Sequence, residues 1–237
     1  MLAIALKTFL VVTTTLAIEQ GYKNIKELVN SRKQNPCVLR CGDVTFDFSK
    51  SPHLLVGGLS NMGKTVFCET LLRGREDINV CLLNSFTEDF RGVKAHRYNN
   101  TNHIVTLLSE VSSGQIRGTE DKPLYIVIDE LLELTLREKT IGKLLQRAMT
   151  VARHYYVYFI VIVQEALKEV LSSKSLFNMR VCFGMVDPQS YSVVLGYNPD
   201  ENKLLKQREY FFRTHERMGR ATVPQRAFSH QGTGATD

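Results

Sequence analysis

An eight-residue segment, Gly58-Leu59-Ser60-Asn61-Met62-Gly63-Lys64-Thr65, has the residue types and spacing of a phosphate-binding loop. It fits the pattern G-x-x-x-x-G-K-S/T without a mismatch, and that pattern is informative only between a strand and a helix. The apolar run 54–56 precedes the loop, and apolar residues at helical spacing follow it from Val66 to Leu72. A loop that fits by chance is the alternative, and both flanks argue against it.

Each part of this loop has a chemical role if a nucleotide binds there. Gly58 and Gly63 allow backbone shapes that a side chain would obstruct, so that N–H groups converge on phosphate oxygens. The helix that begins here adds its positive end. Lys64 would reach the β- and γ-phosphates, and the Thr65 hydroxyl would ligate Mg²⁺. We therefore expect residues 58–66 to bind the nucleotide.

A pair of carboxylates supplies the other half of the expected site. Residues 124–128 are five apolar residues in a row, which is typical of a strand buried on both faces of a parallel sheet, and Asp129 and Glu130 follow directly. An NTPase needs one carboxylate to hold Mg²⁺, largely through water, and one to position the attacking water. We assign the metal to Asp129 and the activation of water to Glu130.

A polar residue also ends the next predicted strand. The apolar run 157–163 leads directly to Gln164. At the end of that strand its amide could reach the γ-phosphate or the attacking water, so Gln164 is a candidate catalytic residue. A polar residue that merely ends a strand is the alternative interpretation.

Strands alternate with helices around these residues, which predicts an α/β protein with ligands at the carboxyl ends of the strands. We expect a largely parallel central sheet flanked by helices. Further strands are predicted at 37–41, 44–48, 78–83, 180–185 and 209–212, and helices at 104–111 and 138–153. Residues 84–103 are polar and are expected to be irregular.

Composition sets broad limits on the class of protein. The 237 residues, 43% hydrophobic and 23% charged, indicate one substantial globular core rather than a disordered chain. A net charge of +6 is a mild bias toward polyanions or an anionic membrane. Five cysteines without paired spacing predict reduced thiols in a cytoplasmic protein. Cys37-x-x-x-Cys41 has no second Cys/His pair at zinc-ligand spacing.

The N-terminal segment leaves two interpretations open. Residues 1–20 are predicted to form an apolar helix, and basic residues follow it. The first interpretation is a membrane anchor through residues 1–18, in which Lys7 snorkels and the following domain stays in the cytoplasm. The second is a soluble helix packed on the core or on a neighbouring subunit. A secretory signal is not expected, because there is no basic start and no small-x-small cleavage site.

Four stretches of the sequence, taken together, resemble the FtsK/SpoIIIE family of HerA-like motor ATPases. They are "SPHLLVGGLSNMGKTV", "PLYIVIDELLEL", "AMTVARHYYVYFIVIVQ" and "LFNMRVCFGMVDPQSYSVVLG", in the family's order. The resemblance covers about residues 42–225 and implies a RecA-like P-loop fold. The expected organisation is an apolar segment at 1–20, a connector at 21–41, an ATPase domain at 42–226 and a flexible tail at 227–237.

The resemblance implies ATP-driven movement of double-stranded DNA through a homo-oligomeric ring, a hexamer, with ATP bound between subunits. It also implies an arginine supplied by the neighbouring subunit. Arg147 matches the place of that arginine, and Arg153 matches a second one before the next strand. Such a cation would offset charge on the transferring phosphoryl group. For either arginine, a solvated helix face is the alternative.

Departures from the family narrow the expected process. Glu165-Ala166 follow Gln164 where the family has Arg-Pro, so the loop that senses nucleotide is expected to differ. The expected chain has neither a ring-stacking domain before the motor nor a winged-helix domain after it. These departures favour phage DNA packaging, or transfer by a conjugative or mobile element, over chromosome segregation.

Three other functional classes remain as alternatives. A P-loop enzyme such as a small-molecule kinase would need no DNA, and Glu130 beside Asp129 favours water over a hydroxyl acceptor. A guanine-nucleotide switch would need N-K-x-D, and Asn202-Lys203-Leu204-Leu205 lacks the aspartate. A P-loop ATPase that moves or assembles protein would share the same nucleotide site.

Overall fold

A computed structural model describes residues 34–164, 174–199 and 205–225. The chain divides into two compact units, Met1–Asn35 and Pro36–Asp237, and the described helices and strands belong to the second. The N-terminal segment 1–20 and the tail 227–237 lie outside the described residues, so the two interpretations of the N-terminus stay predictions. Within the described ranges, no helix has the length and apolar character needed to cross a membrane.

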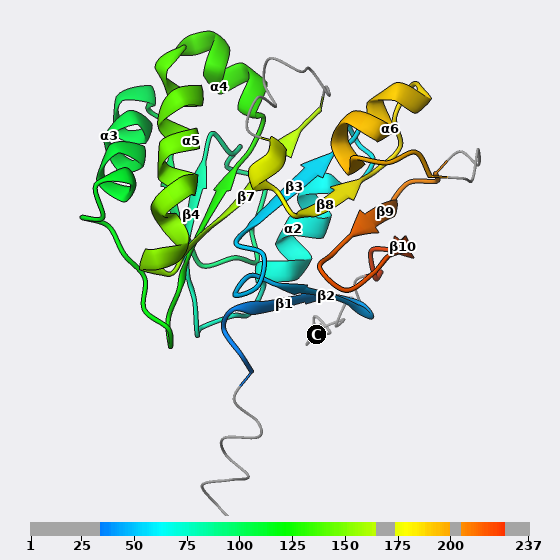
Figure 1. Cartoon of the computed structure of the whole chain (residues 1–237), viewed down its shortest axis with the longest axis horizontal. Helices are drawn as coiled ribbons and strands as arrows, with labels where there is room; N and C mark the ends of the chain where they lie inside the picture. The colour runs from blue at the N-terminus through cyan, green and yellow to red at the C-terminus, as the bar shows by residue number, and fades with distance from the viewer. Residues whose placement is uncertain (1–33, 165–173, 200–204, 226–237) are drawn as a thin grey trace, which may run out of the picture. The chain divides into compact units, whose positions relative to one another are not determined.

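Eight strands form one sheet (Figure 1). In spatial order they are β10 (Met218–Thr222), β9 (Glu209–Arg213), β8 (Met179–Cys182), β3 (His53–Gly57), β7 (Val157–Val163), β6 (Leu124–Ile128), β4 (Asn79–Leu83) and β5 (His96–Tyr98). The six from β8 to β5 pair in parallel, whereas β9 and β10 pair antiparallel at one edge. The predicted α/β fold with a largely parallel sheet is therefore confirmed. The strand β5 lies in a region predicted to be irregular.

Helices cover both faces of this sheet because the side chains of each central strand alternate between them. On one face lie α3 (Thr101–Ser112), α4 (Leu131–Arg137), α5 (Thr140–Ala152) and α6 (Pro188–Leu195), packed on strand residues such as Leu55. On the other lie α2 (Lys64–Leu72) and the hairpin of β1 (Val38–Cys41) and β2 (Val44–Asp47), packed on strand residues such as Leu54 and Val56. Figure 1 shows α3, α4 and α5 side by side.

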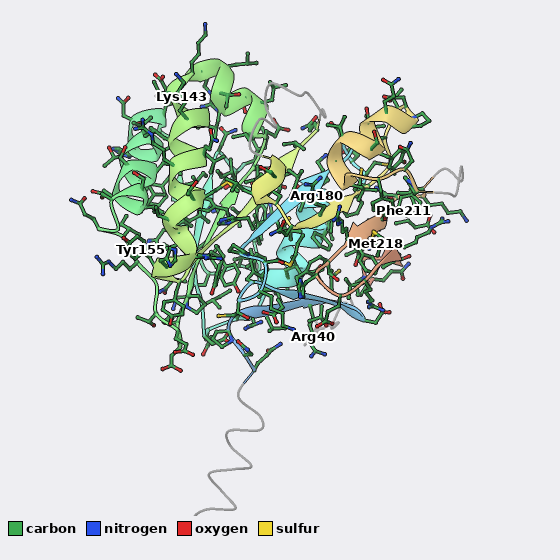
Figure 2. All side chains as sticks on the ribbon, in the orientation of Figure 1. Arg40, Lys143, Tyr155, Arg180, Phe211 and Met218 are labelled. Atoms are coloured by element: carbon green, nitrogen blue, oxygen red, sulfur yellow. The ribbon has the colours of Figure 1, made fainter. Side chains whose placement is uncertain are left out.

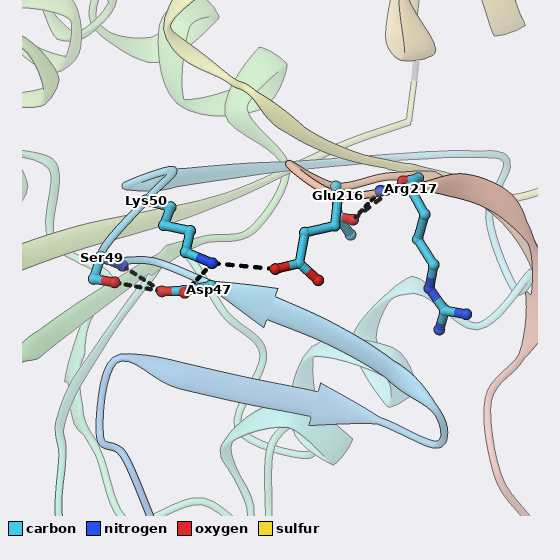
Figure 3. Close-up of polar contacts among 6 residues, drawn as sticks. Asp47, Ser49, Lys50, Glu216 and Arg217 are labelled. Atoms are coloured by element: carbon cyan, nitrogen blue, oxygen red, sulfur yellow. Dashed lines mark hydrogen bonds and ion pairs between the residues drawn. The ribbon is translucent and has the colours of Figure 1, made fainter.

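The β1–β2 hairpin is tied to the turn between β9 and β10 by surface charges (Figure 3). Lys50 Nζ lies 3.1 Å from a carboxylate oxygen of Glu216 and 3.6 Å from one of Asp47, whose other oxygen accepts from Ser49. Arg217 donates to the carbonyl of Asp43 at 2.6 Å. Exposed ion pairs contribute little individually. Together they join the hairpin to the antiparallel end of the sheet.

His53 connects three elements in the core below the loop. It lies at the start of β3 and is 1% exposed. Its Nε2 is 2.9 Å from the carbonyl of Met149 in α5, and its Nδ1 accepts from the backbone N–H of Phe159 in β7 at 3.2 Å. Burial lowers the pKa of His53 to about 4, and the contact with the Met149 carbonyl opposes that shift. The histidine is therefore neutral at pH 7, with the proton on Nε2.

All five cysteines are buried and free, in agreement with the prediction of reduced thiols. Of the two cysteines considered as zinc ligands, Cys37 directly precedes β1 and Cys41 is its last residue. Burial is the main cause that raises the pKa of each thiol. Because the thiolate is the reactive form, these cysteines behave as small core residues.

Candidate nucleotide-binding site

The phosphate-binding loop joins β3 to α2 at the edge formed by the carboxyl ends of the parallel strands. Its two glycines are required by geometry. Gly58 has φ +148°, and a Cβ there would lie 2.6 Å from Cβ of Phe183. Gly63 has φ +109° and is the N-cap of α2. A non-glycine residue would be strained at both positions, so these glycines determine the path of the loop.

Three hydrogen bonds from outside the loop fix its backbone. The N–H of Leu59 donates to the carbonyl of Gly184, which follows β8, at 3.0 Å. From the segment before β9, the N–H of Arg208 donates to the carbonyl of Met62 at 2.9 Å. Nε2 of Gln207, in the same segment, donates to the carbonyl of Asn61 at 3.0 Å. These bonds restrain the backbone of the loop at Leu59, Asn61 and Met62.

Lys64 is 7% exposed, and its ammonium lies inside the curve of the loop. Nζ donates to the carbonyls of Gly58 at 2.7 Å and Leu59 at 2.8 Å. Burial lowers the pKa of Lys64, and the nearby carboxylates of Asp129 and Glu130 oppose that shift. Phosphate oxygens would be stronger acceptors for this ammonium than neutral carbonyls, because both groups would be charged.

Asp129 and Glu130 follow β6 at the same edge of the sheet. Asp129 is 6% exposed. Burial, with smaller contributions from Asp89 and Glu130, raises the pKa of Asp129 to about 7, while Lys64 opposes the shift. A buried carboxyl among other carboxyls favours a nearby cation, because a cation lowers its pKa and stabilises the charged form.

The donor set fits Mg²⁺ bound together with a nucleotide. Among the described residues there is no group of three or more His, Cys, Asp and Glu that could hold a metal alone. Mg²⁺ ordinarily keeps several waters and uses one or two protein oxygens plus substrate phosphates. Asp129 and the hydroxyl of Thr65, at the first turn of α2, would be those protein oxygens.

Glu130 and Gln164 are in direct contact. Gln164, at the end of β7, donates through Nε2 to a carboxylate oxygen of Glu130. Its Oε1 accepts from the hydroxyl of Ser60 in the loop at 2.7 Å. One amide therefore connects the loop after β3 with the carboxylate after β6, across the strand between them.

A second network, which the sequence did not indicate, holds the backbone of Asp129. Asn84 follows β4, and its Nδ2 donates to the backbone carbonyl of Asp129 at 3.1 Å and to Glu133 at 2.8 Å. Arg137 donates to Oδ1 of Asn84 and pairs with Glu133 at 3.0 Å. The only available signal was the position of Asn84, a polar residue directly after an apolar strand.

Left-handed backbone conformations are concentrated at this site. Six described non-glycine residues have positive φ, and four of them, Asn61, Asn84, Glu130 and Arg208, belong to the loop or to residues in contact with it or with Asp129. Such conformations are unfavourable for side chains other than glycine and tend to occur where function requires them. At Glu130 the value is φ +54°, which allows β6 to pass directly into α4.

Within the described part of the chain, neither Arg147 nor Arg153 makes a hydrogen bond or ion pair with Lys64, Asp129, Glu130 or Gln164. Both side chains are exposed on α5 or just after it. Arg153 lies three residues before Tyr156, whose carbonyl accepts a hydrogen bond from Leu124, the first residue of β6. Arg153 is therefore near the start of the parallel strands, at the edge of the sheet opposite the phosphate-binding loop. Figure 2 shows the helix running between Lys143 and Tyr155. Arg147 lies about 9 Å along the helix from Arg153, at 1.5 Å per residue.

A cavity of about 310 Å³ opens beside the loop. Part of its lining was predicted: Asn61, Gly63, Lys64, Thr65 and Val66. The rest comes from two segments that the sequence did not single out, and consists of Asp89, Gln207 and Arg208. The cavity therefore extends from the start of α2 to the segment before β9.

A scan against models of protein families finds no match. No curated protein matches the sequence either. Several solved structures resemble the fold. The conjugation coupling protein TcpA of pCW3, in its monomer form with ATPγS, has a TM-score of 0.63 and 18% identity, over 81% of this chain and 66% of TcpA.

Two further structures have the same fold at lower identity. The cytoplasmic domain of the type VII secretion ATPase EccC from Thermomonospora curvata has a TM-score of 0.61 and 17% identity, over 81% of this chain and 29% of EccC. The genome packaging NTPase B204 from Sulfolobus turreted icosahedral virus 2, in complex with ATPγS, has a TM-score of 0.52 and 11% identity, over 73% of this chain and 98% of B204.

These likenesses, together with the loop described above, define the chain as having a P-loop NTPase fold. The described unit spans about two thirds of TcpA and less than one third of EccC. At identities below 20% the likeness establishes the fold, and the substrate that the fold acts on is a separate question.

Proposed function

We propose that this protein is an ATPase that moves double-stranded DNA, with ATP hydrolysed at the interfaces of a homo-oligomeric ring. The observation that carries the ATPase part is the meeting of Lys64, Asp129, Glu130 and Gln164 at one edge of the sheet. Each has the chemistry that phosphoryl transfer to water needs. Their proximity comes from three adjacent parallel strands, β3, β7 and β6.

The roles of these residues follow from their positions. Mg²⁺, when bound with ATP, would supply positive charge between the phosphates. Lys64 would exchange its two loop carbonyls for phosphate oxygens and balance their charge. Glu130 would orient the attacking water and accept its proton. Gln164, which already holds one carboxylate oxygen of Glu130, would fix the direction in which the other oxygen points.

DNA as the moved substrate is supported by two of the similar structures and by charge. TcpA is a conjugation coupling protein, and B204 is a genome packaging NTPase. A net charge of +6 favours a polyanion. We propose packaging of phage DNA or conjugative transfer as the process, in a hexameric ring.

Movement of protein is the second candidate, because EccC is a type VII secretion ATPase of the same fold. The two candidates differ in one measurable property. A DNA motor should hydrolyse ATP faster when duplex DNA is added, and a protein motor should not.

ATP hydrolysis by the full chain, measured with and without duplex DNA, tests this proposal. We expect DNA to stimulate hydrolysis, and we expect Lys64→Ala to abolish it, since the phosphate charge would lose its cation. Stimulation should weaken as salt is raised, because phosphate contacts release counterions. Hydrolysis that DNA does not change would favour the protein motor. Absence of Mg²⁺-dependent hydrolysis would contradict an ATPase of either kind.

A further inference from the structure

The two halves of the phosphate-binding loop contact different groups. Its first half contacts the catalytic side, since Lys64 folds onto Gly58 and Leu59 and Ser60 donates to Gln164. The hydrogen bonds that its second half accepts from described residues outside the loop and α2 come from the segment before β9, where Gln207 donates to Asn61 and Arg208 donates to Met62. A nucleotide with its γ-phosphate at Glu130 would therefore extend its other end toward residues 207–208.

Arg208 has a backbone position that is fixed from both sides. Its N–H donates to the carbonyl of Met62 at 2.9 Å, and its carbonyl accepts from the N–H of Val223 at 2.9 Å. These bonds hold Arg208 at φ +70°, a conformation that favours glycine. The chain thus keeps a large cationic side chain where glycine would be easier to accommodate.

The side chain of Arg208 runs over Gly63 toward the start of α2. A Cβ at Gly63 would lie 3.4 Å from both Cα and Cγ of Arg208, and Arg208 lines the cavity beside Lys64 and Thr65. Its guanidinium has no hydrogen bond or ion pair within the described ranges, whereas the adjacent Glu209 pairs with Arg220 at 2.7 Å. An unpaired guanidinium next to a helix N-terminus and a lysine favours an anion between them.

We propose that Arg208 is a nucleotide-binding residue that contacts the nucleoside-side phosphates, which ATP and ADP share, from within the same subunit. This inference rests on the proposed function, because it requires that the loop binds a nucleotide. Gln207 is the adjacent polar group on that side and fixes the loop through Asn61. The role of Arg208 differs from that of the catalytic residues, which would act at the γ-phosphate.

The test compares binding of ATP and of ADP to the full chain and to Arg208→Gly, by calorimetric titration with Mg²⁺. Glycine adopts φ +70° without strain, so this variant removes the cation and leaves the backbone path available. We expect both nucleotides to bind about tenfold more weakly, the effect of one charge-assisted hydrogen bond, with their affinity ratio unchanged. Arg208→Lys should recover part of the loss.

Lys206→Ala is the matched control, since it removes an exposed cation two residues away that lies outside the cavity. We expect it to bind both nucleotides as the wild type does. An equal loss in this control, an unchanged affinity in Arg208→Gly, or a loss for ATP alone would each overturn the assignment. If the wild type bound neither nucleotide, the proposed function itself would fail, and Arg208 with it.

Discussion

The hydroxyl of Ser60 donates to Oε1 of Gln164 at 2.7 Å, which joins the phosphate-binding loop to the end of β7. Nε2 of the same amide donates to Glu130. The amide thus uses its acceptor on the loop and its donor on the carboxylate that would activate water. Because Ser60 lies inside the loop, a bound γ-phosphate would compete for its hydroxyl, and this would change the restraint on Gln164 and Glu130.

We predict that Gln164→Ala lowers the rate of ATP hydrolysis about tenfold, the equivalent of one hydrogen bond, while ATP binds with nearly unchanged affinity. The reason is that Glu130 would lose the donor that orients it. Turnover and binding should be measured separately for this variant. Ser60→Ala is its control, because it removes only the bond to Oε1 and should have a smaller effect. A similar rate in Gln164→Ala and the wild type would exclude a catalytic role for the amide.

Glu130→Gln should bind ATP but hydrolyse it roughly 10²–10⁴ times more slowly, since an amide cannot accept the proton of the attacking water. The substitution keeps the size of the side chain and retains an oxygen that can accept from Gln164. Single-turnover hydrolysis, with binding measured in parallel, checks this prediction. Full turnover by Glu130→Gln would show that another residue activates the water.

The central sheet could be predicted because strands buried on both faces are unbroken apolar runs. The strands predicted at 124–128 and 157–163 occur with those bounds, and the helix predicted at 138–153 is α5, Thr140–Ala152. The strand β5 could not be predicted in this way, because its three residues, His96–Tyr98, are polar or aromatic and lie at a sheet edge. Its pairing with β4 is a tertiary contact.

Helix signals were present in the sequence at two places where no helix start was predicted. The side chain of Asn100 caps α3 by accepting from the backbone N–H groups of Asn102 and His103. The helix therefore begins at Thr101 rather than at residue 104. Asp187 caps α6, with Pro188 in the first turn. Both are ordinary N-terminal signals that a reading based on apolar periodicity misses.

In the candidate site, residues at strand ends could be predicted from the sequence, whereas residues in loops could not. The loop, Asp129, Glu130 and Gln164 follow directly from strand ends, and parallel strands bring such ends together. Asn84 could have been included on that argument. Asp89, Gln207 and Arg208 come from loops, and no local pattern indicates that residues 207–208 return to a loop about 145 positions earlier. The place of Gln207 and Arg208 depends on the antiparallel pairing of β9 with β8, whereas Asp89 lies in the connection between β4 and β5.

Stability should depend on pH through His53. In the unfolded chain this histidine takes up a proton near its ordinary pKa of 6.5, whereas burial lowers the pKa to about 4 in the folded protein. Between these values the unfolded state binds more protons, so the free energy of unfolding should fall as pH falls from about 6.5 to about 4. The loss would be about 3 kcal/mol. Denaturant unfolding at several pH values measures it.

His53→Gln should remove this dependence, because its amide can donate to the Met149 carbonyl and does not titrate. His154→Gln, which changes an exposed histidine in the helical turn that follows α5, should retain it. If His53→Gln lost stability between pH 6.5 and pH 4 as steeply as the wild type, other groups would be responsible for the acid sensitivity.

The last prediction concerns the arginine expected from a neighbouring subunit. Arg147 lies on α5, is exposed, and has no hydrogen bond or ion pair from its guanidinium to the described residues. We expect Arg147→Ala to bind ATP almost normally and to hydrolyse it about 10³–10⁵ times more slowly, as when a finger supplied in trans is lost.

An experiment that mixes two kinds of variant subunit decides whether the arginine acts between subunits. Arg147→Ala and Lys64→Ala should each be inactive alone, whereas a mixed ring can place an intact Lys64 beside an intact Arg147. Partial recovery of DNA-stimulated hydrolysis would support that role. Rings shown to mix without recovery would transfer it to Arg153, whose place at the opposite edge of the sheet then requires a different packing between subunits.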